Sequence, residues 1–140
     1  MKIIIASGYF DPLHAGHIEY LKLAKQLGDK LIVILNNKKQ CILKKGTSFM
    51  PQEERKIILE ALKFVDVVFE SVDEDKSVCK SIKTIAEKYK GHEIIFAKGG
   101  DRFSYEIPEA KICQEAKIKI VDQLGKKIQS SSNLTGIKEK

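Results

Sequence analysis

The chain has 140 residues, of which 43% are hydrophobic and 31% charged. These proportions are typical of a soluble globular protein with one hydrophobic core, so we expect a single domain over residues 1–140. Its apolar runs are too short for a signal peptide or a membrane span, which predicts a cytoplasmic protein with no membrane partner.

The net charge of +6 comes almost entirely from lysine, because only Arg55 and Arg102 among the 25 basic residues are arginine. Surfaces that read nucleic-acid bases favour arginine, so the composition argues against a nucleic-acid partner and is compatible with phosphorylated small molecules. Cys41, Cys79 and Cys113 are odd in number and widely spaced. This pattern excludes an ordinary disulfide framework or zinc site, and we expect buried, reduced thiols.

Short apolar runs alternate with longer amphipathic stretches along the chain. The runs predict strands at Lys2–Ala6, Leu31–Leu35, Val65–Phe69, Glu93–Ala97 and Ile118–Val121. The stretches predict helices at Gly16–Leu27, Pro51–Leu62, Lys76–Tyr89 and about Pro108–Ala116, with a last helix from Ser132 onward. The alternation predicts an α/β fold, a Rossmann-like doubly wound parallel sheet of five strands with helices on both faces.

In such a sheet, ligands bind beyond the carboxyl ends of the strands. The loops expected there are Ser7–Gly16, Asn36–Met50 and Lys98–Glu106, and the unusual residues of the chain gather in them. Within the second loop, the segment Asn37–Met50 is long, and we expect it to be a mobile lid that becomes ordered over a bound ligand.

The first loop contains the sequence His14-Ala15-Gly16-His17, an H-x-G-H pattern at the start of the first predicted helix. Free N–H groups and the helix dipole favour an anion there, and Gly16 lets a phosphate approach the backbone. The two imidazoles project from the same region of the first turn, as donors for charge that develops during group transfer. Without the preceding strand and the apolar helix face that follows, such a pair would indicate only a surface or capping position.

The loop also contains Asp11, four residues beyond Ser7 at the strand end. Its carboxylate is suited to holding Mg²⁺ against phosphate. Its alternative role is an Asx turn before Pro12.

The segment GYFDPLHAGHIEYLKLAKQLGDKLIV, residues 8–33, strongly resembles the cytidylyltransferase-like branch of the H-x-G-H nucleotidyltransferases. The resemblance continues in EERKIILEALKFVD, in KGGDR and in IQSSSNL, at residues 53–66, 98–102 and 128–134. It implies an enzyme that moves a nucleotidyl group from a nucleoside triphosphate to a phosphorylated acceptor, with Mg²⁺ as cofactor and release of pyrophosphate. It also implies a homodimer.

The resemblance implies roles for individual residues. His14 and His17 would contact the triphosphate, and Lys44 would clamp phosphates, with its neighbour Lys45 as a substitute. Asp11 would be the metal ligand. The implied nucleotide-binding residues are Gly8, Tyr9, Phe10, Gly16, Arg55, Lys98, Gly99, Gly100, Asp101, Ser130, Ser131 and Ser132. Taken alone, the glycine turn, the serine run and the loop lysines are more typical of ordinary surface structure.

Cytidine is the commonest base in this branch, so the resemblance favours CTP over ATP. The C-terminal part of the chain is most similar to small cytidylyltransferases of surface-polysaccharide pathways. This similarity implies phosphoglutamine, in capsular polysaccharide modification, as the acceptor; glycerol-3-phosphate, heptose 1-phosphate, phosphoethanolamine and FMN remain open. A non-catalytic nucleotide-sensing module is the alternative from another class. The presence of His14, His17 and Asp11 favours an enzyme, because a pure binder has no need of transition-state donors.

Overall fold

Five parallel strands form one sheet in the order β3-β2-β1-β4-β5 in the computed structural model, which describes residues 1–10, 15–46, 50–99 and 108–124. The strands are β1 (Lys2–Gly8), β2 (Lys30–Leu35), β3 (Val67–Glu70), β4 (Glu93–Gly99) and β5 (Lys119–Leu124). The helices are α1 (Ala15–Lys25), α2 (Lys38–Lys45), α3 (Gln52–Glu60), α4 (Cys79–Lys88) and α5 (Ala110–Glu115). The predicted doubly wound, Rossmann-like α/β fold is confirmed.

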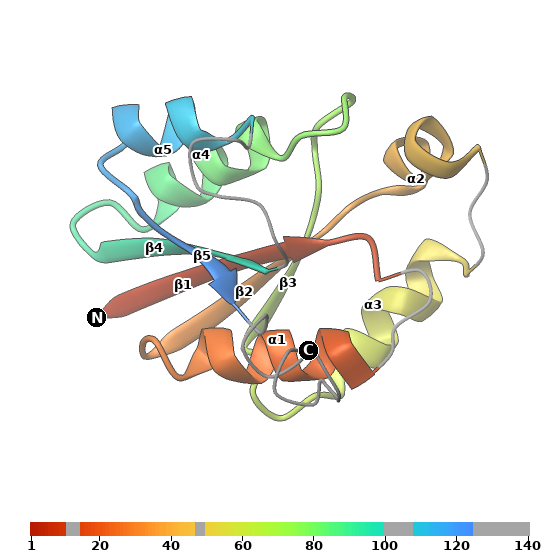
Figure 1. The fold of residues 1–140 in the computed structure, drawn as a ribbon, viewed down its shortest axis with the longest axis horizontal. Coiled ribbons are helices and arrows are strands. Elements are labelled where there is room, and N and C mark those ends of the chain that lie inside the picture. Colours follow the sequence, from red (N-terminus) through yellow and green to blue (C-terminus); the bar gives the residue numbers. More distant parts are fainter. Residues whose placement is uncertain (11–14, 47–49, 100–107, 125–140) are drawn as a thin grey trace, which may run out of the picture.

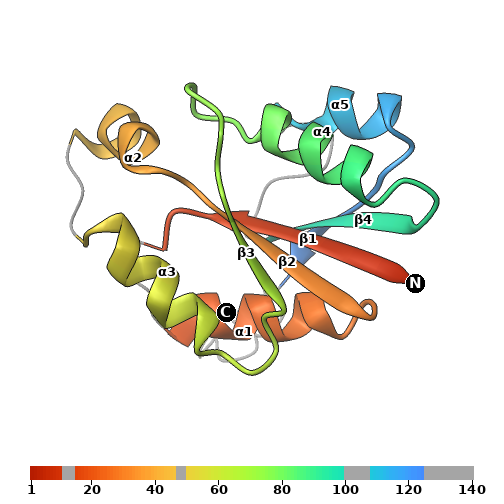
Figure 2. The same cartoon turned by 180° about the vertical axis from the view of Figure 1, so that it is seen from behind.

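The sheet separates two layers of helices. Helices α1 and α3 cover one face, and α4 and α5 cover the other (Figures 1 and 2). The strand order runs outward from β1 in both directions, so strand order reverses between β1 and β4. Within the described residues, none of the helices has the length and apolar content needed to cross a bilayer.

The alternation of side chains along β1 explains why both faces must be covered. Ile3, Ile4, Ile5 and Ala6 are all fully buried. Ile3 and Ile5 belong to a core cluster with residues of α4 and α5, whereas Ile4 and Ala6 belong to one with residues of α1 and α3. A strand that is apolar on both sides is typical of a parallel sheet with helices on both faces.

Helix α2 is the element that the sequence reading missed. We expected a loop from Asn37 to Met50, and this is wrong over residues 38–45. Asn37 caps the helix, because its side chain accepts a hydrogen bond from the Gln40 N–H while the Gln40 side chain accepts one from the Asn37 N–H. Gly46 ends it in the left-handed conformation, with φ 82°. This capping box and terminal glycine are helix signals that the polar composition of the segment concealed.

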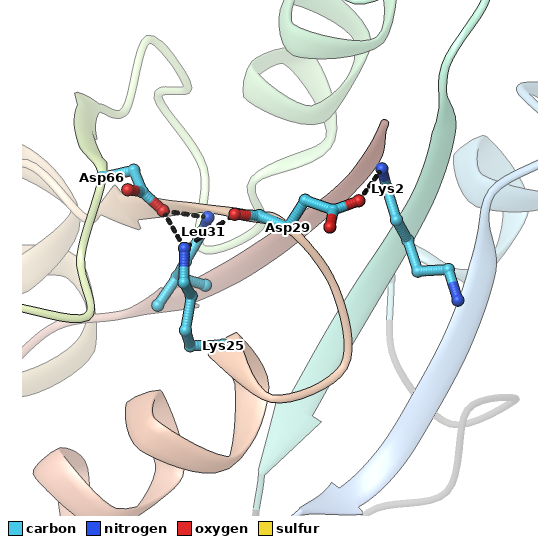
Figure 3. Close-up of polar contacts among 5 residues, drawn as sticks. All are labelled: Lys2, Lys25, Asp29, Leu31 and Asp66. Atoms are coloured by element: carbon cyan, nitrogen blue, oxygen red, sulfur yellow. Dashed lines mark hydrogen bonds and ion pairs between the residues drawn. The ribbon is translucent and has the colours of Figure 1, made fainter.

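Polar contacts join three segments at the amino end of the sheet (Figure 3). The Lys25 Nζ donates to the Asp66 carboxylate at 2.6 Å and to the Asp29 carbonyl at 2.7 Å. The same carboxylate accepts from the Leu31 N–H at 2.8 Å, and Asp29 exchanges hydrogen bonds with the Lys2 backbone. These contacts tie the end of α1 to the starts of β1 and β2, away from the carboxyl ends of the strands.

Asp66 should make the stability of the fold sensitive to acid. Burial alone would raise the pKa of its carboxyl, but hydrogen bonds from Lys25 and the Leu31 N–H outweigh it and hold the pKa below its ordinary value. The stabilisation is therefore complete above the unfolded-state pKa and is lost as the pH falls through the folded-state pKa. The free energy of unfolding, measured with urea between about pH 6 and about pH 3, should fall less steeply in Asp66→Asn than in the wild type.

The exposed Glu60 provides the control Glu60→Gln, whose pH dependence should match the wild type. Parallel curves for Asp66→Asn and the wild type would contradict this account.

Candidate functional site

Gly8 and Phe10, at the end of β1 and just beyond it, orient one of the predicted catalytic histidines. Phe10 is buried and has a φ of 50°, an uncommon backbone conformation for a residue other than glycine. Its ring lies edge-on to the half-buried ring of His17, with centroids 5.1 Å apart. It also lies directly over Gly8, where a Cβ would come within 2.8 Å of the ring. A glycine at position 8 thus leaves the space that Phe10 fills, and Phe10 in turn packs against His17.

His17 lies in the first turn of α1, which begins at Ala15, and Gly16 precedes it. The first N–H groups of a helix have no partner within the helix and form a positive end that favours anions. This end of α1 follows β1, at the carboxyl edge of the sheet (Figure 1). The imidazole and the helix end together form an arrangement that can bind phosphate oxygens.

Arg55 joins the loops that follow β1 and β2. It lies on α3 with an exposed fraction of only 1%. Its Nη1 donates to the carbonyls of Tyr9 at 2.8 Å and Asn36 at 3.0 Å, and its Nε donates to the Met50 carbonyl at 3.2 Å. Its buried Nη2 has no hydrogen-bond partner within the described part of the chain. Arg55 therefore holds backbone segments together, and its contact with nucleotide stays a prediction.

Tyr9 is half-buried, and its surroundings disfavour ionisation of its phenol. Burial raises the pKa of this phenol, and the nearby Cys41, Glu109 and Asp75 raise it further. A protonated phenol is a hydrogen-bond donor at neutral pH. The Tyr9 carbonyl accepts from Arg55 on α3. The phenol of Tyr9 lies near enough to Cys41 on α2 and to Glu109 just before α5 for these groups to affect its pKa.

Helix α2 is anchored to the loop between β3 and α4. The amide nitrogen of Asn37 donates to the carbonyls of Ser71 at 3.1 Å and Asp73 at 2.9 Å. Gln40 is fully buried, and its amide nitrogen donates to the carbonyls of Asp75 at 2.7 Å and Ser77 at 2.8 Å. The predicted phosphate-clamping Lys44 is in the last turn of this helix, so these two amides fix the backbone that carries it.

The described residues include part of the predicted site. Gly8, Tyr9, Phe10, Gly16, His17, Arg55, Lys98 and Gly99 lie on β1, α1, α3 and β4 or next to them. Lys44 and Gly99 are placed by their backbone only. Asp11, His14, Gly100, Asp101, Ser130, Ser131 and Ser132 lie outside the described residues, so their roles stay predictions. Sequence reasoning missed Asn37 and Gln40, although the capping box is a readable local signal.

A magnesium ion at this site would not need a dense cluster of protein ligands. Mg²⁺ is usually held by one or two carboxylates together with substrate phosphates and water. The described residues contain no group of three or more histidine, cysteine or acidic side chains that could hold a metal. Asp11, the carboxylate that the sequence predicts as a ligand of Mg²⁺, lies outside the described residues, so this role stays a prediction.

The cysteines do not have the properties of nucleophiles. Cys41 and Cys113 are buried and Cys79 is half-buried, and all three are free thiols. Burial raises the pKa of Cys113 to about 12 and also raises the pKa of Cys79. Because the thiolate is the reactive form, these raised pKa values favour the neutral, less nucleophilic thiol at Cys79 and Cys113.

Three comparisons relate the chain to known proteins. A family model described as cytidylyltransferase-like matches residues 5–132. The bifunctional protein HldE of Cronobacter sakazakii is 38% identical across 71% of this chain, which covers 24% of that protein. The FAD synthase of Ferroglobus placidus is 43% identical across 54% of this chain, which covers 49% of that enzyme. The chain thus spans about a quarter to a half of the length of these relatives.

A solved structure shows the same fold over most of the chain. The crystal structure of the lipopolysaccharide core biosynthesis protein from Thermoplasma volcanium GSS1 superposes with a TM-score of 0.70 at 26% sequence identity. The match covers 88% of this chain and 96% of that one.

A methyl group at position 8 should disturb the contact between Phe10 and His17. Gly8→Ala should lower the free energy of unfolding by about 1–3 kcal/mol, because overpacking forces the ring to move. The carbon-bound proton signals of His17 should shift in the NMR spectrum. The same substitution in a Phe10→Leu background should cost much less, because the ring atoms that meet the methyl are gone. An equal cost in both backgrounds would contradict the proposed packing.

Removing the Gln40 amide should loosen α2. Gln40→Met keeps a similar volume but leaves the Asp75 and Ser77 carbonyls without their donor. We expect the free energy of unfolding in urea to fall by about 1–3 kcal/mol. Lys39→Met on the same helix, where the lysine is exposed and paired with Glu74, should change it by less than about 0.5 kcal/mol. Similar values for the two variants would count against the anchoring role.

Proposed function

Because the chain belongs to the cytidylyltransferase-like family, we propose that it moves a nucleotidyl group from a nucleoside triphosphate to a phosphorylated small molecule. The observation that carries the proposal is the position of His17, in the first turn of α1 and beyond the carboxyl end of the central strand. This edge of a doubly wound sheet is where such folds bind ligands.

The proposed reaction needs alignment and charge stabilisation more than a strong base. An oxygen of the acceptor phosphate attacks the α-phosphorus of the triphosphate and forms a new P–O bond. The bond from the α-phosphorus to the oxygen bridging it to the β-phosphorus breaks, and the electron pair leaves with pyrophosphate. The acceptor oxygen is already anionic at neutral pH, so no proton has to be removed from it first.

The chain contributes donors to the phosphate oxygens. His17 and the N-terminal N–H groups of α1 donate to oxygens on which charge develops, and His14 and Lys44 add to them. Lys98 and Gly99, at the end of β4, and the predicted serine run would hold the nucleotide. Arg55 keeps the backbones of Tyr9 and Asn36 in place around the bound nucleotide. When bound, Mg²⁺ neutralises phosphate charge, and Asp11 is its proposed ligand.

The substrates that we propose are CTP and phosphoglutamine, in the modification of a capsular polysaccharide. The resemblance of the C-terminal part of the chain to small cytidylyltransferases supports this choice. The alternative acceptors heptose 1-phosphate and FMN, with ATP as donor, gain support from the relatives named bifunctional protein HldE and FAD synthase. Glycerol-3-phosphate and phosphoethanolamine are further acceptors to be tested. We also propose that the protein is cytoplasmic and forms a homodimer. A light-scattering measurement of its mass in solution tests the homodimer.

An assay of pyrophosphate release identifies both substrates together. Each of CTP, ATP, UTP and GTP is combined with each of the five acceptors in the presence of Mg²⁺. Release that requires both CTP and phosphoglutamine supports the full proposal, and release with another pair supports the reaction class while replacing the substrates. If triphosphate binds and no combination releases pyrophosphate, the non-catalytic sensing module becomes the better account.

The histidine pair gives a sharper test once one substrate pair is known. His17→Ala should lower kcat by about 10²–10³-fold, because a donor to the charge in the transition state is lost. The folded state should persist, as shown by an unchanged circular dichroism spectrum. His92→Ala is the matched control, since His92 lies just before β4 and contacts the amino terminus at the opposite end of the sheet. Near-normal turnover in His17→Ala would show that His17 is not a catalytic residue.

A further inference from the structure

One buried hydroxyl joins α1 to two strands at the centre of the sheet. Tyr20 is buried on α1, with an exposed fraction of 8%. Its hydroxyl donates to the Ala97 carbonyl of β4 at 2.6 Å and accepts from the Ser7 N–H of β1 at 3.3 Å. The short donated bond joins residues that are 77 positions apart in the sequence.

The hydroxyl lies where β1 and β4 part. The pairing of β1 with β4 runs from Lys2↔Glu93 to Ala6↔Ala97, whereas its pairing with β2 continues to Gly8↔Leu35. The register of β4 with β5 also shifts between Ala97 and Gly99. Since strand order reverses between β1 and β4, the two strands diverge at the position where this class of sheet binds its ligand.

The three segments held by this hydroxyl are the ones that carry the candidate site. His17 lies three residues before Tyr20, on the same side of α1. Ser7 precedes Gly8, over which Phe10 packs. Ala97 precedes Lys98. A single phenol therefore links the backbone positions of His17, Gly8 and Lys98.

The surroundings keep Tyr20 in its donor form. Burial raises the pKa of the phenol well above its ordinary value, and the Ser7 N–H opposes this only in part. The phenol is therefore protonated throughout the physiological range and is not a base. A phenylalanine at position 20 would fill almost the same volume, so Tyr20→Phe removes the hydroxyl and its two hydrogen bonds while the rest of the packing is kept.

We propose that Tyr20 is a positioning residue for nucleotidyl transfer, which fixes α1 and its His17 relative to Lys98 across the divergence of β1 and β4. The inference rests on the proposed function. Its physical basis is that transfer depends on the alignment of donors around the α-phosphorus, and a displacement of about 1 Å in such a site costs about 10²-fold in rate.

Tyr20→Phe tests the proposal kinetically. We expect kcat to fall by about 10–100-fold at a temperature well below the unfolding midpoint, with a smaller change in KM for the triphosphate. Tyr89→Phe is the matched control, because Tyr89 follows α4 and its ring lies under Lys30 at the start of β2, at the amino end of the sheet. It should keep wild-type kinetics. A lower melting temperature with unchanged kcat would show that the hydroxyl only stabilises the fold, and would overturn the proposal.

A second readout separates this inference from the proposed reaction. Amide exchange at Ser7 and the amide chemical shift of Lys98 are measured by NMR in the wild type, Tyr20→Phe and Tyr89→Phe. If the wild type shows no turnover with any substrate pair, the proposed function fails. Tyr20 is then judged by the spectra alone: faster exchange at Ser7 with a displaced Lys98 signal, both restricted to Tyr20→Phe, supports the positioning role. Unchanged signals overturn it.

Discussion

The guanidinium of Arg55 determines where the loops after β1 and β2 can lie. A buried positive charge is costly unless polar partners surround it, and here the partners are the carbonyls of Tyr9, Asn36 and Met50. Hydrogen bonds to a charged donor are about twice as strong as neutral ones, so three carbonyls from separate segments are drawn to one point. Phe10 can hold its uncommon backbone conformation because the residue before it is fixed in this way.

The sequence was sufficient to predict the sheet because each strand carries its own signal. Runs such as Lys2–Ala6 and Leu31–Leu35 are apolar on both sides, which favours a central parallel strand. The limits were less certain: β1 and β4 each continue two residues further, to Gly8 and Gly99. Those last residues belong to the sheet through backbone hydrogen bonds, which a pattern of hydrophobic side chains does not reveal. Helix α2 was missed for a related reason, since its stability comes from caps and long-range amide contacts.

The candidate site was predictable where its chemistry is local and not where it depends on tertiary contacts. The position of His17 at a helix start could be predicted from a four-residue pattern, because neighbours in the chain set a helix start, whereas its contact with triphosphate stays a prediction. Arg55 was predicted to bind nucleotide, yet its observed partners are carbonyls 5 to 46 residues away. Tyr20 and Gln40 also contact residues far away in the sequence, at separations of 77 and 37 positions. Only packing brings such partners together, so a pattern search over the chain cannot find them.

The two ends of the sheet are built by different means, and this difference suits the proposed reaction. At the amino end, Lys25 at the end of α1 pairs with Asp66 just before β3, so each of these charges is neutralised by the other within the protein (Figure 3). At the carboxyl end, Arg55 donates from Nε and Nη1 to neutral carbonyls, so none of these contacts cancels its positive charge with a carboxylate. A charge held by dipoles still attracts anions over several ångströms when water is excluded. The fold thus holds a buried cation against the Tyr9 carbonyl, in the segment that leads from β1 to the helix end where a triphosphate is proposed to bind, and a carboxylate partner like Asp66 would weaken that attraction.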